Sequence, residues 1–182
     1  MSEVLVLVDH VDGKVKKPAL ELLTIAARLG EPSAVVLGAG GDAAVATLAA
    51  YGAAKVYRCD SPDLDGALVA PKAELLAQLV EQTSPAALLI TSTAEGKEIG
   101  ARVAIKTGSG LITDAIDVQA GGNGVLTTQA AFAASYTVEA TVTKGTPIVT
   151  VKPNSAAPVE AAGAGAVEAV SFSASDAAKA AA

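Results

Sequence analysis

A run of apolar residues ends in hydroxyl side chains just before an expected helix. Residues 88–90 are apolar, positions 91–93 are Thr, Ser and Thr, and Gly96 and Lys97 stand in the first turn of the helix. Such a turn presents unpaired backbone N–H groups and the positive end of the helix dipole, which attract phosphate. The Walker pattern is missing, because no Ser or Thr follows Lys97. Two interpretations stay open: a phosphate site, or hydroxyl groups that cap the helix while Gly96 permits a tight turn.

A second glycine-rich turn, Gly-Ala-Gly-Gly-Asp at residues 38–42, also joins an expected strand to a helix. It differs from a dinucleotide-binding fingerprint, which has a third small residue further on and normally follows the first strand. We interpret the segment as a flexible turn and predict that Asp42 is the helix N-cap.

His10, the only histidine, follows Asp9 at the end of the first expected strand. Doubly wound sheets bind ligands at this edge. A Ser-His-Asp site would also need a nucleophile on a sharp turn, and the Gly-x-Ser-x-Gly pattern is absent; residues 108–111, Gly-Ser-Gly-Leu, fall one residue short of it. We therefore predict a hydrogen-bonded turn histidine rather than a catalytic one.

Two further groups of polar side chains could do chemistry. Cys59 lies between Arg58 and Asp60, which could tune a thiolate, but the sequence has no second cysteine to resolve a disulfide. Asp114 and Asp117 could ligate a cation, yet they fall on opposite faces of a strand-like stretch and lack a third ligand. We expect Cys59 to be structural and the two aspartates to be solvated. No catalytic and no metal-binding residue is predicted.

The first half of the chain alternates apolar runs with segments of helical spacing. Strands are expected at residues 4–8, 33–37, 55–59 and 86–90, and helices at residues 18–29, 43–51 and 71–82. Short turns between such elements indicate βαβ units with right-handed crossovers. The sequence therefore predicts an α/β fold with a doubly wound, mainly parallel sheet.

The pattern changes after Thr107. Residues 112–120 and 124–132 flank a glycine-rich turn, and residues 136–143 and 147–153 flank Lys144-Gly145-Thr146. Both arrangements are typical of β-hairpins. We predict two hairpins, which add antiparallel strands to the sheet.

The C-terminal part has a different composition. We assign residues 1–152 to one α/β domain, residues 153–166 to a linker-like loop rich in Ala, Gly and Pro, and residues 167–182 to a terminal strand and the start of a truncated next element. Val170, Phe172 and Ala174 alternate as a short strand would, and Ser175 could cap a helix. We expect that another element follows in the complete protein, or that the terminus frays.

Composition narrows the functional classes. The 182 residues are 51% hydrophobic but only 3% aromatic, and the net charge is −6 without any basic run. This composition fits one domain with a core of Ala, Val, Leu and Ile, and nucleic acid is an unexpected partner. A single cysteine fits a reducing compartment, and neither a signal peptide nor an apolar run of membrane-spanning length is found. We expect a cytoplasmic protein without membrane insertion.

Three segments together resemble the N-terminal domain of the alpha subunit of electron transfer flavoproteins. They are residues 4–30, 92–118 and 171–178, so the resemblance covers nearly the whole chain in order. The positions that match the family's patterns are Asp9-His10, Arg28-Leu29-Gly30, Gly96-Lys97, Arg102 and Thr113-Asp114. The resemblance implies a three-layer fold of the adenine nucleotide alpha hydrolase-like type.

The resemblance also implies a function. Family members are heterodimers of alpha and beta subunits that pass electrons from acyl-CoA dehydrogenases of fatty acid β-oxidation, and related dehydrogenases, to a membrane quinone oxidoreductase. FAD is held mainly by the C-terminal domain of alpha, through an "SGGRG"-like segment and a "GISGAIQH"-like loop. Neither occurs here. We therefore expect an electron carrier fragment rather than an enzyme, with no FAD-binding residue and no bound FAD in this chain.

The turn at residues 91–97 also has a counterpart in that family. The beta subunit has a similarly folded domain that holds AMP, whereas the equivalent region of alpha packs against its partner. The resemblance thus implies nucleotide-site geometry without its ligand. The alternative is a stand-alone nucleotide-binding α/β module that uses the crevice near Asp9, Gly38 and Gly96. A small hydrolase acting through His10 is a third hypothesis, but it lacks a nucleophile.

Overall fold

The computed structural model describes residues 2–64, 66, 68–122 and 124–180. Asn123 in the first predicted hairpin turn and residues 181–182 of the predicted last helix lie outside this description. In the described part of the chain, nine strands form one sheet in the order β11-β5-β4-β1-β6-β10-β7-β8-β9. The strands in chain order are β1 (Glu3–Leu7), β4 (Glu31–Leu37), β5 (Lys55–Cys59), β6 (Ala87–Thr91), β7 (Leu111–Gly121), β8 (Gly124–Ala131), β9 (Tyr136–Thr141), β10 (Ile148–Val151) and β11 (Ala166–Ala169).

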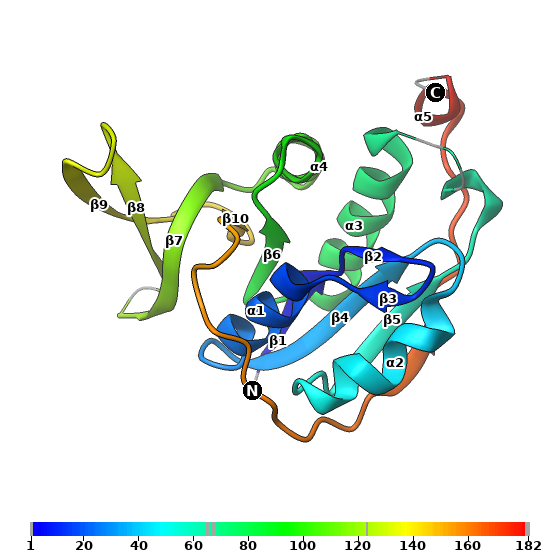
Figure 1. Cartoon of the computed structure of the whole chain (residues 1–182). Helices are drawn as coiled ribbons and strands as arrows, with labels where there is room; N and C mark the ends of the chain where they lie inside the picture. Colours follow the sequence, from blue (N-terminus) through cyan, green and yellow to red (C-terminus); the bar gives the residue numbers. More distant parts are fainter. Residues whose placement is uncertain (1, 65, 67, 123, 181–182) are drawn as a thin grey trace.

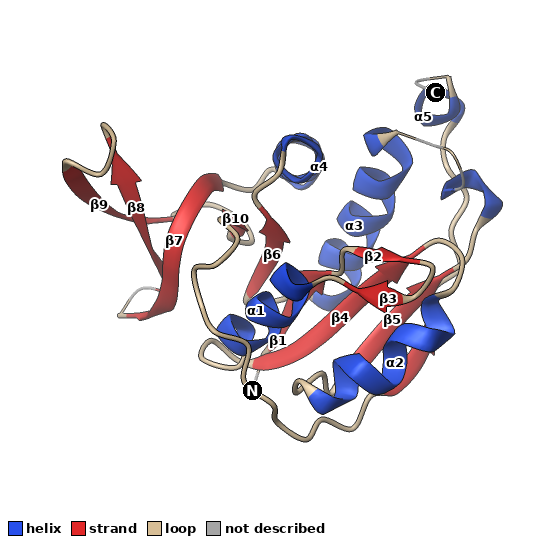
Figure 2. Ribbon diagram, in the orientation of Figure 1, coloured by secondary structure: helices blue, strands red, loops and turns tan. Residues whose placement is uncertain are grey.

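Helices cover both faces of the parallel part of the sheet (Figures 1 and 2). On one face, α1 (Lys17–Ala26) and α2 (Gly41–Ala50) share a core cluster with Val4 and Val6 of β1; on the other, α3 (Val69–Thr83) and α4 (Ala94–Thr107) share a second cluster with Leu5 and Leu7. Successive strand residues point to opposite faces, so a continuous apolar strand supplies both layers of the core. The predicted doubly wound, three-layer fold with added antiparallel strands is confirmed.

A small hairpin follows the first strand. Strands β2 (His10–Val11) and β3 (Lys14–Val15) pair outside the main sheet, and Gly13 turns the chain at a φ of 78°. This positive φ suits glycine, which has no Cβ to clash. The hairpin places His10 beside the carboxyl ends of the central strands.

The second predicted hairpin is wrong. Strands β7 and β8 pair antiparallel as predicted, but β9 pairs with β8, and β10 runs parallel between β6 and β7. The reason is burial: all four residues of β10 are buried, whereas β9 is exposed at all but one position. An apolar strand buried on both faces belongs inside a sheet rather than at the edge of a hairpin.

The C-terminal segment returns along the sheet edge. After β10 the chain passes the N-terminus and α2, then pairs as β11 with β5 (Figure 1). The strand predicted from the alternation at residues 170–174 lies earlier, at Ala166–Ala169, and its four residues are exposed. This strand is held by main-chain pairing with β5 at the edge of the sheet, so its sequence carries no alternation of buried and exposed residues. The short helix α5 (Asp176–Lys179) begins after Ser175, whose side chain accepts a hydrogen bond from the Ala178 N–H, as predicted.

Candidate functional site

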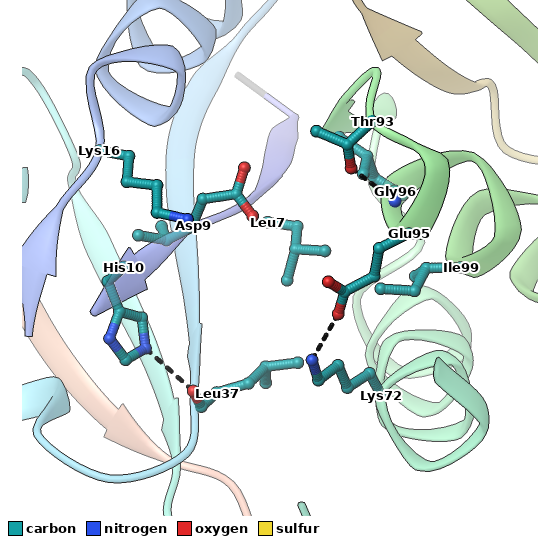
Figure 3. Close-up of a pocket in the computed structure, with 12 residues that line it drawn as sticks. Leu7, Asp9, His10, Lys16, Leu37, Lys72, Thr93, Glu95, Gly96 and Ile99 are labelled. Carbon is teal, nitrogen blue, oxygen red and sulfur yellow. Dashed lines mark hydrogen bonds and ion pairs between the residues drawn. The ribbon is translucent and has the colours of Figure 1, made fainter. Parts of the chain in front are cut away.

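A crevice lies at the carboxyl ends of the central strands, with a volume of about 180 Å³. From β1 the chain adds β4 and β5 on one side of the sheet, and then returns to add β6 on the other side of β1. The strand order therefore reverses at β1, and open α/β sheets bind ligands at such a point. Its walls come from the ends of β1, β4 and β6 and from the first turns of α3 and α4 (Figure 3). The polar lining residues are Asp9, His10, Lys16, Lys72, Thr93 and Glu95.

The start of α4 is capped by the chain itself. Thr93 is the N-cap, and its Oγ1 accepts a hydrogen bond of 2.9 Å from the Gly96 N–H. A Cβ added to Gly96 would lie 2.1 Å from the carbonyl oxygen of Thr91, so glycine lets the helix approach the end of β6 closely. Helix capping with a tight approach at Gly96 is confirmed for Thr93, whereas the Ser92 hydroxyl bonds Asp114 instead of capping the helix.

An ion pair lies across the same end of the helix. Glu95, in the first turn of α4, is 2.5 Å from Lys72 of α3, measured from Oε1 to Nζ (Figure 3). A carboxylate near a helix N-terminus is favoured by the helix dipole, as a phosphate would be. Asp9 and Glu95 balance Lys16 and Lys72 around the crevice. The formal charges of these four side chains therefore sum to zero, and the Glu95 carboxylate already occupies the anion-favouring end of the helix.

His10 has a hydrogen-bond partner for each ring nitrogen. Its Nε2 lies 2.9 Å from the carbonyl oxygen of Leu37, and its Nδ1 accepts from the Gly13 N–H at 3.2 Å. Because a backbone N–H can only donate, these partners select the tautomer with the proton on Nε2. The ring ties the β2–β3 hairpin to the end of β4. The predicted hydrogen-bonded turn histidine is confirmed.

The turn at residues 38–42 differs from its prediction. The N-cap of α2 is Gly40, in the left-handed region with a φ of 82°, and Asp42 lies inside the first turn. The prediction that Asp42 is the N-cap is wrong, because its carboxylate pairs with Arg58 of β5. Arg58 also pairs with Asp60.

Cys59 ends β5 and is buried. Burial raises the pKa of its thiol above the ordinary value, because it penalises the charged thiolate. The neighbouring Arg58 is committed to two carboxylates. Cys59 therefore packs as a small apolar residue, as the sequence predicts.

The carboxyl ends of β6 and β10 meet Asp114 of β7 in a polar cluster that the sequence reasoning missed. Ser92 Oγ donates to Asp114 Oδ1 at 2.7 Å, Thr150 Oγ1 donates to Ser92 Oγ at 3.0 Å, and Lys97 Nζ lies 3.5 Å from Asp114. The hydrogen bond from Ser92 and the charge of Lys97 hold the pKa of Asp114 below its ordinary value. A carboxylate of lowered pKa is a weak base, so the cluster joins three strands rather than activating the serine.

Asp114 and Asp117 have separate partners. Asp114 has a left-handed φ of 59° where the pairing of β7 with β10 shifts register, and Asp117 binds Arg28 of the α1 segment at 3.0 Å. The two carboxylates thus stabilise different parts of the sheet. Within the described residues, no group of three or more His, Cys, Asp or Glu is placed to hold a metal ion.

Comparison with known proteins identifies the family. The family model described as "Electron transfer flavoprotein domain" matches residues 4–177. The chain belongs to this family. It is 47% identical over 167 residues to the electron transfer flavoprotein subunit alpha of Mycobacterium tuberculosis (strain ATCC 25618 / H37Rv), and 44% identical to that of Mycobacterium leprae (strain TN). Each alignment covers 91% of this chain and 52% of the relative, so the chain spans about half the length of these relatives.

A more distant relative carries a different name. The chain is 31% identical over 114 residues to the lactate dehydrogenase (NAD(+),ferredoxin) subunit LctC of Acetobacterium woodii, which covers 60% of this chain and 27% of the relative.

The helices were also compared with the dimensions of a bilayer. Among the described residues, no helix has the length and apolarity to span a membrane.

Five of the positions that resemble the electron transfer flavoprotein patterns lie at the crevice or in the polar cluster beside it. Asp9, His10 and Gly96 lie at the crevice, and Asp114 and Lys97 lie in the polar cluster beside it. Arg102 does not line this crevice; it binds Glu98 one turn earlier in α4 at 2.8 Å. The signal that could have found the polar cluster is therefore the family motif around Thr113-Asp114 together with the hydroxyl residues after β6.

Proposed function

We propose that this chain is the N-terminal domain of an electron transfer flavoprotein alpha subunit and serves as its scaffold and subunit interface. The observation that carries the proposal is the family match over residues 4–177, together with alignment to half the length of alpha subunits. In this proposal FAD belongs to the other half of the alpha chain. The domain itself is an electron carrier fragment and not an enzyme.

The finer parts of the function follow from the same family. The alpha chain pairs with a beta subunit, and the heterodimer carries electrons from acyl-CoA dehydrogenases to a membrane quinone oxidoreductase in the cytoplasm. The relative LctC is named as a subunit of a lactate dehydrogenase that uses NAD(+) and ferredoxin. A related domain therefore also occurs in a protein named as a dehydrogenase subunit, and reduction of this protein by an acyl-CoA dehydrogenase is the assay that identifies its electron donor.

The surface proposed for subunit contact is the antiparallel arm formed by β7, β8 and β9. Figure 1 shows β8 and β9 projecting away from helices α1 to α3. Phe132 and Tyr136 at its tip are 81% and 65% exposed, and Val138 follows on β9. The two rings stack edge to face with centroids 5.8 Å apart. Exposed aromatic side chains beside a free strand edge are typical of contact surfaces.

The division of the chain is part of this proposal. Residues 1–152 form the scaffold, residues 153–166 connect, and residues 167–182 lead toward the flavin-binding half. The β11 pairing with β5 supports this order, because it brings the connecting segment back against the scaffold before the chain turns toward α5.

A domain exchange tests the function. The chain is joined to the second half of the M. tuberculosis alpha subunit and produced with that organism's beta subunit. We expect a yellow heterodimer that accepts electrons from an acyl-CoA dehydrogenase, with the unaltered alpha subunit as the control. A hybrid that folds and retains FAD but fails to assemble with beta would contradict the interface role. A heterodimer that retains FAD but is not reduced would contradict the electron-transfer role.

A further inference from the structure

The segment after β10 is fastened to the domain in two different ways. From residue 161 to residue 170 it is held by main-chain hydrogen bonds. Gly163 N donates to Ala49 O at 2.8 Å, Ala166 N to Ala54 O at 3.0 Å, and Val170 N to Arg58 O at 2.8 Å. A Cβ on Gly163 would lie 2.3 Å from the Ala53 carbonyl oxygen, so the two backbones touch here.

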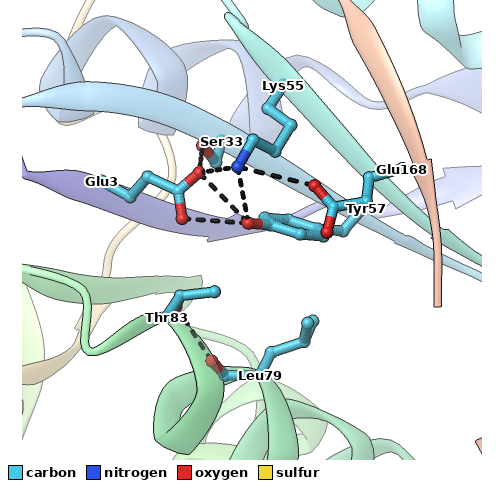
Figure 4. Close-up of polar contacts among 7 residues, drawn as sticks. All are labelled: Glu3, Ser33, Lys55, Tyr57, Leu79, Thr83 and Glu168. Atoms are coloured by element: carbon cyan, nitrogen blue, oxygen red, sulfur yellow. Dashed lines mark hydrogen bonds and ion pairs between the residues drawn. The ribbon is translucent and has the colours of Figure 1, made fainter.

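A partly buried polar network reaches this first part through one ion pair. Lys55 of β5 lies 2.6 Å from Glu3 of β1 and 3.6 Å from Glu168 of β11 (Figure 4). The pair with Glu168 is the longer of the two, and the Glu168 side chain is 57% exposed. An exposed ion pair of this kind contributes little, so the main-chain ladder is the principal fastening of β11.

Beyond Val170 the fastening changes to side chains. Asp63, which precedes α3, accepts the Ala174 N–H at 2.9 Å, and its Oδ2 lies 3.2 Å from Lys179 Nζ. Glu74 of α3 accepts the Ser175 N–H at 3.0 Å and the Ser175 hydroxyl at 2.8 Å. Phe172 is still anchored, because it packs both on the core between the sheet and α3 and on the small cluster of Ala70, Ala174 and Ala178. Beyond Phe172, the apolar contact is limited to the alanines of that small cluster.

The two carboxylates are therefore the main support of the last described residues. The Ala174 N–H and then Lys179 hold the pKa of Asp63 below its ordinary value. Burial alone would raise the pKa of Glu74, but the hydrogen bonds from Ser175 and Lys106 outweigh it and lower the pKa. Both groups are thus ionised at neutral pH, and charge-assisted hydrogen bonds of this type are stronger than neutral ones.

We propose that Asp63 and Glu74 form a releasable carboxylate clasp on the segment Ser173–Lys179. When the carboxylate clasp is closed, the segment lies against α3; when it opens, the chain pivots after Phe172, which stays packed on the core, while β11 stays paired with β5. The inference rests on the proposed function for its consequence: in an alpha chain of the relatives' length, the carboxylate clasp would set the direction in which the flavin-binding half leaves this domain.

Amide hydrogen exchange of this chain, resolved by residue, tests the carboxylate clasp without flavin or beta subunit. In the double variant Asp63→Asn/Glu74→Gln, we expect the amides of Ala174 and Ser175 to exchange about tenfold faster or more. The amides of Gly163 and Val170 should keep their protection. The matched control is Glu168→Gln, which removes the exposed charge from β11 and should leave all four amides unchanged.

Two results would overturn the proposal. Unchanged exchange at Ala174 and Ser175 in the double variant would show that the carboxylates do not hold the segment. Faster exchange that spreads to Gly163 and Val170 would show that the whole C-terminal segment opens together, so that no pivot separates β11 from the clasped residues. If the double variant does not fold, the single variants decide: Asp63→Asn should affect Ala174 most, Glu74→Gln should affect Ser175 most, and no acceleration in either would end the idea. Because the assay needs no partner, its failure is distinct from failure of the domain exchange.

Discussion

His10 stabilises the fold by satisfying two backbone groups at the end of the central strands. His10→Ala would leave the Leu37 carbonyl and the Gly13 N–H without their partner. We expect the free energy of unfolding to fall by about 1–2 kcal/mol, as for the loss of such bonds in a partly buried site. Urea denaturation measures this loss.

The control for His10 is on the same hairpin. Lys14→Ala at the exposed position Lys14 of β3 should change the free energy of unfolding by less than about 0.5 kcal/mol. A hydrolytic activity in the parent chain that disappears in His10→Ala would contradict the structural role.

Gly96 is required because α4 starts against the end of β6. In Gly96→Ala the new Cβ would meet the Thr91 carbonyl oxygen at 2.1 Å, and this backbone oxygen has no freedom to move aside. We expect the free energy of unfolding to fall by about 3 kcal/mol or more. Thermal and urea unfolding, followed by circular dichroism, measure the change.

Gly100 in the same helix is the matched control. Its Cβ would meet only side chains, the nearest being Leu111 Cδ1 at 3.3 Å, so the helix gains the better propensity of alanine with a small adjustment. Gly100→Ala should therefore be within about 1 kcal/mol of the parent. Equal effects of the two substitutions would show that close approach at Gly96 is unimportant.

Short-range chemistry of the candidate site could be predicted from the sequence, and long-range pairing could not. Thr93 caps a helix that begins at the next residue, so the pattern alone gives its role. Ser92 and Asp114 are brought together by the order of strands and by a register shift in β7. Asp42 was misassigned for the same reason, since its partner Arg58 lies on another strand.

The start of β1 is held by a polar network that links it to β4 and β5. Glu3 accepts hydrogen bonds from the hydroxyl groups of Tyr57 and Ser33. It also forms an ion pair with Lys55, with 2.6 Å between Glu3 Oε1 and Lys55 Nζ (Figure 4). Although burial alone would raise the pKa of Glu3, contacts with Lys55 and Tyr57 outweigh it and lower the pKa below 4.5. The bond to Glu3 raises the pKa of Lys55 above its ordinary 10.5, so Lys55 stays charged across the neutral range.

Glu3→Gln should lower the free energy of unfolding by about 1–2 kcal/mol at pH 7, because the lost charge weakens these contacts. A lowered pKa contributes stability above pH 4.5, and the contribution is lost as the pH falls through the lowered pKa. The difference between parent and variant should therefore shrink as the pH falls below 4.5 and through the lowered pKa. Urea denaturation at several pH values on both sides of 4.5 checks this, and a difference that does not shrink on acidification would contradict the role of the charge.

At the scale of elements, the pattern of apolar residues predicts the position of a strand that is buried on one or both faces. It does not predict which strand pairs with which, because neighbours in the sequence need not be neighbours in the sheet. The run at β5 was placed from Lys55 to Cys59 by its sequence alone. Residues 136–151 look like a hairpin, yet β10 leaves its neighbour β9 and inserts between β6 and β7. The complete burial of Ile148 and Val149 is the physical reason, and it becomes visible only when the whole sheet is assembled.

For the whole molecule, we expect the isolated chain to be colourless and redox-silent. Retaining a flavin takes an extended set of polar and apolar contacts. The crevice has a volume of about 180 Å³, and Lys72 and Glu95 pair within it. An absorption spectrum of the chain purified in the presence of added FAD checks this. Stoichiometric absorbance in the flavin bands would contradict the assignment of FAD to the other half.

The last prediction concerns the arm and its partner. In the described part of the chain, β9 is the outermost strand of the sheet and lies next to Phe132 and Tyr136. This is the surface proposed for contact with a beta subunit, and it is small without the flavin-binding half. We therefore expect this chain alone to bind the beta subunit weakly, with a dissociation constant above about 1 µM. Titration of the beta subunit with this chain and with the domain-exchange hybrid, side by side, measures the difference.

Glu139 tests whether the arm is the surface in contact. It is exposed on β9, so Glu139→Lys reverses a charge there with little effect on the fold. Glu160→Lys, exposed on the connecting segment away from the arm, is the matched control. If the arm meets beta, Glu139→Lys should weaken binding of the hybrid about tenfold while Glu160→Lys leaves it unchanged. A dissociation constant below about 1 µM for the chain alone would show that its own interface is sufficient to bind the beta subunit. Equal effects of the two reversals would place the contact elsewhere on the domain.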